Sequence, residues 1–176
     1  AGLDVLPDMA VVSKGLTGGF LPMATVLTTD RLYDVFIADW NAGRAFLHSN
    51  TYAGNALAVA VALAALDVYA TDDVLGHVAR TGPLLRQGLA ALATEHSHLH
   101  HVRGIGMMAA VDLRAADGSL LKPSQRTGWR FSHAAAQRGL LLRSLGDSCY
   151  LFPPLITTPE EIRFLLHAFS ADGFAP

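Results

Sequence analysis

The stretch VVSKGLTGGFLPMATVLTTD (Val11–Asp30) carries one lysine between an apolar run and a glycine-rich bend, and a second apolar run follows the bend. The mostly apolar residues Met9–Ser13 follow a proline, which predicts a short buried strand that ends at Lys14. The glycines after the lysine predict a flexible bend in which the backbone can approach another group closely. Ala24–Leu27 predicts a second strand. The stretch therefore places Lys14 at the end of a strand, where it is either an exposed charge or a chemical reagent.

The chemistry of a lysine in this position allows two interpretations. Many lysines at strand ends are simply solvated. A lysine that is partly buried near other positive charges loses its proton more readily, and the neutral amine attacks a carbonyl carbon to form a Schiff base. The spacing of Lys14 and the glycines leaves both interpretations open.

Outside this stretch, hydrophobic periodicity predicts helices and strands that alternate along the chain. Expected helices cover Thr28–Phe36 (capped by Thr29 or Asp30), Gly54–Ala70, Asp73–Glu95, Gln125–Arg138 and Pro159–Phe169. Expected strands cover Gly106–Leu113, Gly139–Gly146 and Cys149–Pro154. The helix after Gly54 is apolar on nearly all sides, which predicts that it is buried between layers. The alternation predicts an α/β or α+β fold, and a shift in composition near residues 70–95 predicts a joint between two lobes.

The composition argues against several classes of protein. Of the 176 residues, 51% are hydrophobic and 16% are charged, so the chain can bury a substantial core and disorder is not expected. The formal charge of −2 argues against a nucleic-acid surface. The longest apolar run, Ala56–Leu66, is too short to span a bilayer, and no signal peptide is visible. The single cysteine, Cys149, cannot form an internal disulfide, so we expect a cytoplasmic protein with no membrane partner.

Three ordered segments resemble one enzyme family. SKGLTGGFLPMATVLTT (Ser13–Thr29) is similar to the cofactor-lysine segment of the class III aminotransferases, fold-type-I enzymes that depend on pyridoxal phosphate. FLHSNTYAGNALAVAVALAAL (Phe46–Leu66) resembles the segment in which that family has a histidine and a hydroxyl residue before Gly-Asn and an alanine-rich helix. GLLLRSLGDSCYLFPPLITTPEEI (Gly139–Ile162) is similar to the arginine-to-tyrosine segment of the family's diaminononanoate-forming branch in biotin synthesis.

The resemblance implies a cofactor site made by three residues of this chain. Lys14 matches the lysine that holds pyridoxal 5'-phosphate through a Schiff base and later moves a proton. Thr51 matches the hydroxyl that binds the cofactor phosphate, in this family across the interface of a homodimer, and Asn50 matches a neighbour that reaches the phosphate through its backbone. Because Thr51 shortly precedes the helix expected from Gly54, we expect an anion site at the N-terminus of that helix. Without the resemblance, Thr51 would be an ordinary helix cap.

The resemblance also implies three substrate-binding residues. Arg143 matches the arginine that pairs with the substrate carboxylate, which a guanidinium binds through two parallel hydrogen bonds. Tyr150, seven residues later, matches an aromatic residue of the pocket, and Ser49 stands where the family touches substrate, commonly with glycine. Taken alone, Arg143 could form a surface salt bridge, and Tyr150 could be a core residue whose hydroxyl is satisfied.

The implied reaction is a two-step amino transfer on small molecules. The diaminononanoate-forming branch takes an amino group from S-adenosylmethionine, or in some members from lysine, and passes it to 8-amino-7-oxononanoate, which becomes 7,8-diaminononanoate. Arg143 would hold the terminal carboxylate of the acceptor. Two alternatives remain open, namely another class III enzyme such as an omega-amino-acid transaminase, and a truncated non-catalytic chain that associates through an exposed apolar face.

The resemblance covers almost the whole chain but only the C-terminal part, well under half, of a full enzyme. It implies that residues 1–70 are the remainder of the large, cofactor-binding domain, including the end of its sheet. Residues 71–176 would then be a linking helix and the α+β small domain. We therefore expect a fragment, or the ordered part, of a longer enzyme that functions as a homodimer.

The histidines of EHSHLHH (Glu95–His101) are crowded enough to suggest a metal site. Alternation along a strand would place three of them on one side, which could capture zinc adventitiously. Because the segment joins two expected elements, we favour a solvated linker and expect no metal site. His48 is as consistent with a structural histidine as with an active-site group.

Overall fold

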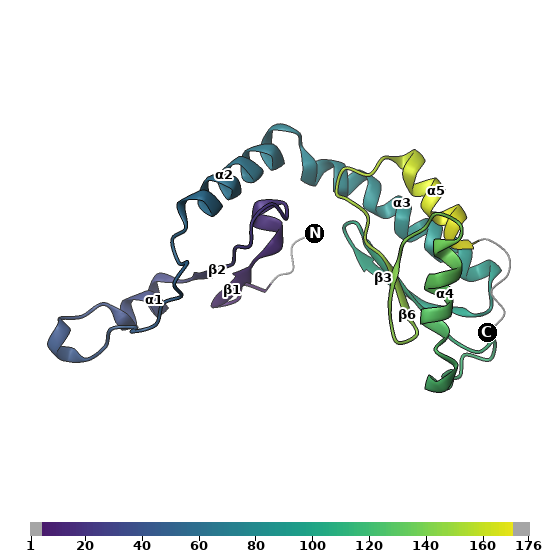
Figure 1. The fold of residues 1–176 in the computed structure, drawn as a ribbon, viewed down its shortest axis with the longest axis horizontal. Coiled ribbons are helices and arrows are strands. Elements are labelled where there is room, and N and C mark those ends of the chain that lie inside the picture. The colour runs from purple at the N-terminus through teal and green to yellow at the C-terminus, as the bar shows by residue number, and fades with distance from the viewer. Residues whose placement is uncertain (1–4, 171–176) are drawn as a thin grey trace. The chain divides into compact units, whose positions relative to one another are not determined.

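The computed structural model describes residues 5–170 of the 176-residue chain. The chain divides into two compact units, Ala1–Asp72 and Asp73–Pro176, and each is described below by itself (Figure 1). The sheet of unit 1 has two strands and that of unit 2 has four. Helices and strands alternate along the chain, as the periodicity predicted.

Unit 1 is built on a short antiparallel strand pair that closes around the lysine loop. Its elements are β1 (Met9–Val12), a 3-10 turn η1 (Lys14–Thr17), β2 (Thr25–Thr28), α1 (Asp30–Tyr33), η2 (Asp34–Phe36), η3 (Trp40–Ala42) and α2 (Ala56–Thr71). The strands pair from Met9 opposite Thr28 to Val12 opposite Thr25. Both expected strands are therefore confirmed within one residue at each end. The helix expected over Thr28–Phe36 is instead one α-helical turn followed by a 3-10 turn.

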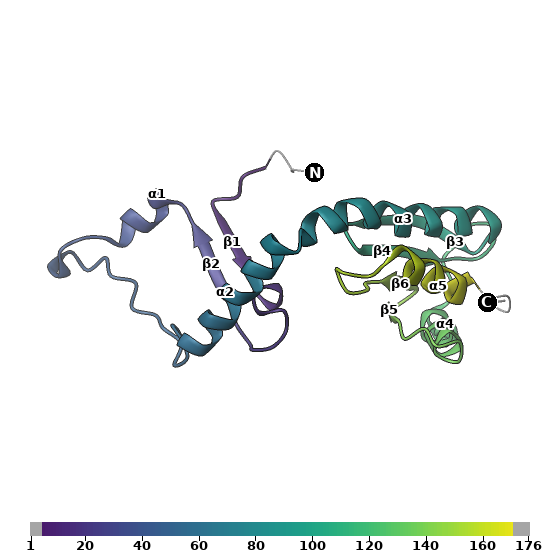
Figure 2. The ribbon, with the colours of Figure 1, turned by 90° about the horizontal axis from the view of Figure 1, so that it is seen from above.

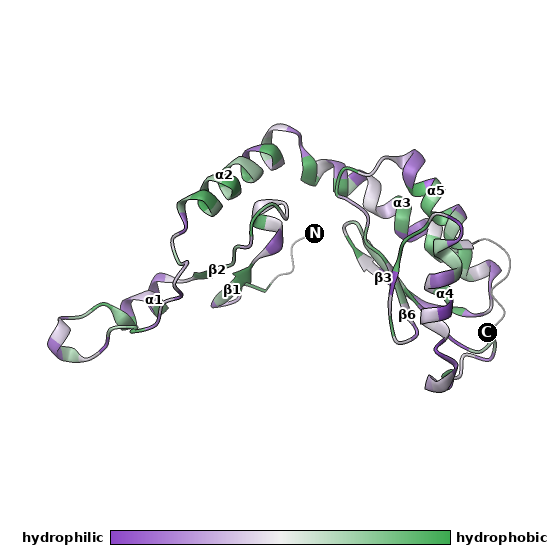
Figure 3. Cartoon of the chain, viewed as in Figure 1, coloured by the Kyte–Doolittle hydropathy of each residue, from purple (hydrophilic) through white to green (hydrophobic). Residues whose placement is uncertain are grey.

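The expected burial of unit 1 is wrong for its strand and its long helix. Met9 and Val11 of β1 are 61% and 71% exposed. In α2, Ala58 and Ala62 are the buried residues. Figure 3 shows the long α2 ribbon coloured mainly hydrophobic. Hydropathy shows that a residue favours burial, but burial also needs a neighbouring layer of structure to pack against. The described residues of unit 1 provide little of such a layer, so the expectation failed.

Unit 2 is an antiparallel sheet with helices on one side. Its elements are α3 (Val74–Glu95), β3 (Leu99–Ile105), β4 (Met108–Leu113), η4 (Pro123–Gln125), α4 (Thr127–Ala136), β5 (Arg143–Leu145), β6 (Ser148–Leu151) and α5 (Pro159–Ser170). The strand order is β3-β4-β6-β5, and every neighbouring pair is antiparallel. None of the helices described between residues 5 and 170 combines the length and apolar content needed to cross a membrane.

The hydrophobic core of the chain lies between this sheet and its three helices. Along β4, Ala109, Val111 and Leu113 are fully buried, whereas the residues between them are not, which is the period-two pattern of a sheet covered on one face. The same cluster contains Leu85 and Leu89 of α3 together with buried residues of α4 and α5. Figure 2 shows α3 and α5 running along the sheet. The opposite face, which carries Met108, Ala110, Asp112, Ser148 and Tyr150, is not covered by any helix in the described part of the chain.

Two expectations for unit 2 are wrong in detail. The histidine-rich segment is not only a linker, because His100 and His101 belong to β3. This strand pairs with β4, and the register of the pairing shifts between His100 and Arg103. The helix expected from Gln125 begins at Thr127, because Arg126 adopts a left-handed backbone with φ of 49° and separates α4 from η4. The remaining expected elements are present, although the strands expected over Gly139–Gly146 and Cys149–Pro154 are shorter than expected and correspond to β5 and β6.

Candidate functional site

Lys14 lies at the first position of η1, two residues after β1 ends. The loop that joins β1 to β2 is fixed by two side-chain hydroxyls. Ser13 Oγ donates a hydrogen bond to the carbonyl oxygen of Met23 (3.1 Å), and buried Thr17 Oγ1 donates to that of Leu21 (2.6 Å). Because one bond lies on each side of the turn, the backbone of Lys14 is held in place while its side chain remains exposed.

A pocket of about 590 Å³ borders Lys14. Its lining also contains Ser13, Gly19, Leu21, Pro22, Met23 and Ala24. Gly19 has a φ of 86°, and no atom lies within 4 Å of the position its Cβ would take, so the glycine bend leaves open space next to the lysine. Among the described residues, the Lys14 amine has no hydrogen bond or ion pair. An unpaired amine beside an open pocket fits a residue that binds an aldehyde cofactor covalently.

Helix α2 packs against η1 within unit 1. Its two buried residues, Ala58 and Ala62, are small, which allows a close approach between helix and turn. The residues Ser49, Asn50 and Thr51 precede the helix in an exposed segment. None of these three lines the pocket beside Lys14 as described. The structure thus brings α2, but not the three predicted residues before it, against the lysine turn.

The expected anion site at the N-terminus of this helix is wrong in its geometry. The helix begins at Ala56, five residues after Thr51, and Asn55 is its N-cap. The Asn55 carboxamide oxygen accepts hydrogen bonds from the backbone N–H groups of Leu57 (3.0 Å) and Ala58 (3.4 Å). These are the donors that an anion would use, so the cap occupies the site. Both Asn and Thr are good caps, and the sequence pattern did not show which residue would cap the helix.

The short turn before α2 is held by hydrogen bonds of its own. The Asn50 carbonyl oxygen accepts a bond from the backbone N–H of Ala53 (2.9 Å), and the Ser49 hydroxyl donates to the same carbonyl (3.3 Å). His48 places its ring 5.8 Å from that of Phe46 in an edge-on contact. The Thr51 hydroxyl makes no hydrogen bond within residues 5–170, so it is available to an external acceptor or donor.

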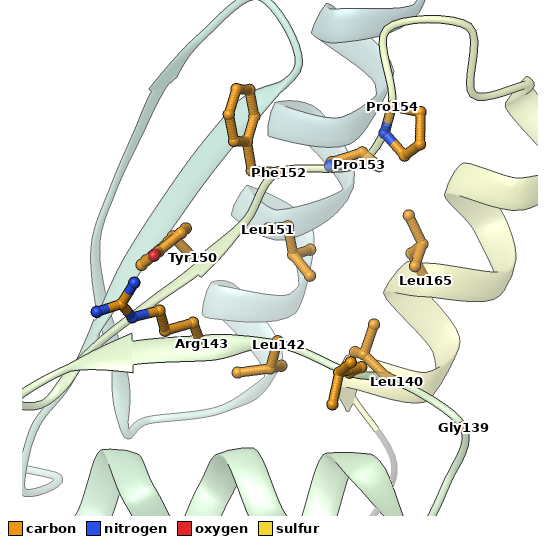
Figure 4. Close-up of a pocket in the computed structure, with 11 residues that line it drawn as sticks. Gly139, Leu140, Leu142, Arg143, Tyr150, Leu151, Phe152, Pro153, Pro154 and Leu165 are labelled. Atoms are coloured by element: carbon orange, nitrogen blue, oxygen red, sulfur yellow. The ribbon is translucent and has the colours of Figure 1, made fainter. Parts of the chain in front are cut away.

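Arg143 and Tyr150 are brought together by the sheet of unit 2. They lie directly opposite each other on β5 and β6, so their side chains leave the same face of the sheet. Figure 4 shows the Arg143 guanidinium beside the Tyr150 ring. Both residues border a pocket of about 540 Å³. The rest of its lining is mainly apolar: Gly139, Leu140, Leu141, Leu142, Leu151, Phe152, Pro153, Pro154 and Leu165.

The Arg143 guanidinium is exposed and has no hydrogen bond, ion pair or cation–π interaction with any described residue. The surface salt bridge considered for it from the sequence is therefore not formed within residues 5–170. Most other arginines of the chain are engaged, for example Arg31 with Asp8 and Arg163 with Glu160. An unpaired guanidinium at the edge of an apolar pocket can bind the carboxylate of an aliphatic ligand through two parallel hydrogen bonds.

A second polar group on the same face was missed by the sequence analysis. The Asp112 carboxylate accepts hydrogen bonds from Ser148 Oγ, from Arg103 (2.9 Å) and from His101 Nδ1 (3.0 Å). Burial raises the pKa of Asp112, but the bonds from Ser148, His101 and Arg103 outweigh it, and the pKa lies well below the ordinary value. The alternation of apolar and polar residues along β4 places Asp112 on the face opposite the core, and this pattern was the sequence signal that could have identified it.

Within residues 5–170, the cysteine and the clustered histidines do not add a further site. Burial, followed by the charges of Asp147 and Asp112, raises the pKa of the Cys149 thiol to about 12, so this cysteine is not a nucleophile at neutral pH. His98 and His100 bond to the backbone carbonyls of Arg114 (3.0 Å) and Ser97 (2.9 Å). Among the described residues, no group of three or more His, Cys, Asp or Glu side chains is placed to bind a metal ion.

The chain is similar to known aminotransferases over nearly its whole length. The family model described as aminotransferase class-III matches residues 1–171. A curated relative from Geobacter sulfurreducens, an adenosylmethionine-8-amino-7-oxononanoate aminotransferase, is 39% identical over 165 residues. That alignment covers 92% of this chain and 36% of the relative. A second such enzyme, from Nitratidesulfovibrio vulgaris, is 38% identical over 93% of this chain and 30% of its own.

Solved structures give the same result. The adenosylmethionine-8-amino-7-oxononanoate aminotransferase from Methanocaldococcus jannaschii superposes with a TM-score of 0.88 at 32% identity, covering 94% of this chain and 38% of its own. An amine transaminase from an uncultivated Pseudomonas species, solved with pyridoxal phosphate bound, has a TM-score of 0.86 at 31% identity, covering 93% and 37%. These shares confirm the expected fold, the C-terminal part of a fold-type-I transferase. The chain spans 30–38% of the length of these proteins and belongs to the class III aminotransferases.

Proposed function

We propose that the protein transfers an amino group to 8-amino-7-oxononanoate, forming 7,8-diaminononanoate, with pyridoxal 5'-phosphate as cofactor. The family match, and the activity for which relatives at 38–39% identity are named, support this reaction. The amino donor is S-adenosylmethionine, as the names of the relatives suggest, or lysine. The observation that carries the proposal is the unpaired Arg143 guanidinium beside Tyr150 at an apolar pocket, which suits an acceptor that combines an aliphatic chain with one terminal carboxylate.

Lys14 is the proposed covalent anchor of the cofactor and the group that moves the proton. When bound, pyridoxal phosphate supplies the electron sink that stabilises negative charge at the substrate carbon. The two hydroxyl bonds of the lysine loop hold the Lys14 backbone still. The open pocket leaves its amine room to swing between attachment and proton transfer. In this scheme the fixed loop determines where the amine starts, and the flexible side chain provides the movement.

Thr51 and Asn50 are the proposed contacts to the cofactor phosphate. The unengaged hydroxyl of Thr51 supports a role as a donor, and the turn that follows holds the Asn50 carbonyl with one backbone hydrogen bond. Because the described part of unit 1 does not place them in the lysine pocket, we propose that they serve the site of a second copy in a homodimer. Ser49 would touch the substrate, and its hydroxymethyl group would narrow the pocket relative to glycine.

Two larger-scale proposals follow from the family membership. Residues 1–70 would form the remainder of the large, cofactor-binding domain, and residues 71–176 the linking helix and the small domain. The enzyme would act as a homodimer on small molecules in the cytoplasm. The single, buried cysteine and its high thiol pKa are compatible with a reducing compartment.

The test is a transamination assay of the full-length protein that carries this sequence, with 8-amino-7-oxononanoate as acceptor and either donor. We expect turnover with one donor, and R143Q should raise the KM for the acceptor far more than it lowers kcat. R130Q is the matched control, since Arg130 is also an arginine of unit 2 whose guanidinium has no partner among the described residues. No turnover with either donor would refute the proposal. Turnover of omega-amino acids instead would identify an omega-amino-acid transaminase.

A further inference from the structure

The uncovered face of the sheet in unit 2 carries an arginine at each edge, in the same row. Arg143 of β5 lies opposite Tyr150 of β6, Tyr150 lies opposite Ala110 of β4, and Ala110 lies opposite Arg103 of β3. Cross-strand partners project to the same side of a sheet. Three strand spacings separate the two arginines, so their backbones are about 14 Å apart. The row therefore holds two guanidinium groups with a tyrosine and an alanine between them.

The two arginines differ in how they are engaged. The Arg103 guanidinium donates to Asp112 Oδ1 (2.9 Å), to Ser148 Oγ (2.8 Å) and to the backbone carbonyl of His101 (2.9 Å). Its side chain thus reaches across β4 to β6. The Arg143 guanidinium, by contrast, has no partner within residues 5–170. One end of the row is neutralised and the other is open.

The Asp112 carboxylate accounts for this difference between the two arginines, because it accepts a hydrogen bond from Arg103. Its side chain is 14% exposed, while that of Arg103 is 51% exposed, so the carboxylate is fixed in the sheet and the arginine folds over it. Hydrogen bonds from His101 and Ser148, together with an ion pair to Arg114 (3.5 Å), also hold the carboxylate. Bonds to the ionised form keep Asp112 charged, which keeps Arg103 engaged.

We propose that Asp112 sets the specificity of this face for substrates with a single carboxylate. It does so by engaging Arg103, which leaves Arg143 as the one open guanidinium of the row. The inference rests on the proposed role of Arg143 in carboxylate binding. Without the Asp112 charge, Arg103 would become a second carboxylate site in line with Arg143, and aliphatic dicarboxylates would compete with the monocarboxylate substrate. Asp112 is thus a specificity-determining residue that acts through Arg103 and does not touch the ligand.

The experiment compares nonanoate with nonanedioate, the same chain with a carboxylate at one or both ends. Binding to the full-length, cofactor-loaded protein is measured by calorimetry, so the readout is independent of turnover. In the unaltered protein the affinities for nonanoate and nonanedioate should agree within twofold, because the single open guanidinium binds one carboxylate of either ligand. In D112N, which keeps the size and an acceptor oxygen but removes the charge, the preference for nonanedioate should rise about fivefold, the upper end for an exposed ion pair. The double variant D112N/R103Q should lose that gain.

Several outcomes would overturn the inference. An unchanged ratio in D112N would do so, and so would a gain that survives in D112N/R103Q, since Arg103 would then not be its source. If D112N does not fold, dicarboxylates of increasing chain length are compared in the unaltered protein, where a length optimum would show that Arg103 is already open. The control R143Q should weaken nonanoate binding, and an unchanged affinity there would remove the premise even if transamination is observed.

Discussion

The two units of the chain differ in how far each covers its own apolar surface. Unit 2 encloses a core between one sheet face and three helices, with Leu85, Leu89 and Val111 fully buried. In unit 1 the apolar side chains of α2 are largely open, and Leu57 and Leu63 are 74% and 59% exposed. Burial of apolar area is the main stabilising term in folding. Unit 2 is therefore stabilised from within, whereas unit 1 depends on surfaces other than those described here.

The same difference separates the candidate residues of unit 1 from those of unit 2. Arg143 and Tyr150 are held by register in a sheet whose other face is core. Lys14 is held by loop hydroxyl bonds and a helix of small residues. The Arg143–Tyr150 pair is thus the better fixed of the two groups, because it lies on a sheet with a buried core, whereas Lys14 lies on a loop in a unit that leaves most of its apolar side chains exposed.

The largest expected effect comes from removing a core leucine of unit 2. Leu89→Ala should lower the free energy of unfolding of this unit by about 3 kcal/mol, because a fully buried side chain leaves a cavity. Leu63→Ala in α2 is the matched change and should cost about 0.5 kcal/mol or less in this 176-residue chain. Denaturant unfolding is followed by Trp129 in a Trp40→Phe background for unit 2, and by Trp40 in a Trp129→Phe background for unit 1. Equal costs at the two positions would contradict the contrast between the units.

The next effect is the response of unit 2 to acid. The pKa of Asp112 is lowered in the folded state, so the unfolded chain takes up the proton first as the pH falls. The stability that the carboxylate contributes is therefore fully present above its ordinary pKa of 3.8 and is lost as the pH drops below that value. Unfolding curves of unit 2 between pH 5 and about 2 should show this loss, and D112N should flatten it. A D112N profile as steep as that of the unaltered chain would contradict the role of the carboxylate network.

The smallest effect compares the helix caps of the two units. Thr158 and Glu161 form a reciprocal capping box on α5, and Asn55 caps α2. Each substitution, Thr158→Ala or Asn55→Ala, should cost about 1 kcal/mol locally. In unit 2 the cost should appear in the global unfolding of the unit, because α5 belongs to the core. In unit 1 hydrogen exchange should show fraying limited to the first turns of α2, and protection lost across unit 2 in Asn55→Ala would refute the separation.

The sequence predicted the helices and strands better than it predicted burial. The apolar runs before and after Lys14 gave both strands of unit 1, since their patterns are local. The seven-residue spacing of Arg143 and Tyr150 became a register pair because the turn between β5 and β6 is short. The exposure of α2 could not be predicted, because it depends on neighbours that the pattern does not contain.

Two further features could not be predicted from the sequence, each for a specific reason. The register irregularity between His100 and Arg103 interrupts the two-residue alternation of β3. The alternation therefore predicted neither the strand nor the position of Arg103 on the open face. The second feature is the N-cap of α2. Asn and Thr are both favoured at helix N-caps, so the sequence alone could not show that Asn55, and not Thr51, caps the helix.

The central claim is that Lys14 is the residue that binds pyridoxal phosphate. The most direct measurement is reduction of the full-length, cofactor-loaded protein with borohydride, followed by proteolysis and mass spectrometry of the labelled peptide. The account predicts that the phosphopyridoxyl label lies on Lys14, and that Lys14→Ala abolishes labelling while Lys122→Ala leaves it unchanged. Label on any other residue, or undiminished labelling of Lys14→Ala, would contradict the account.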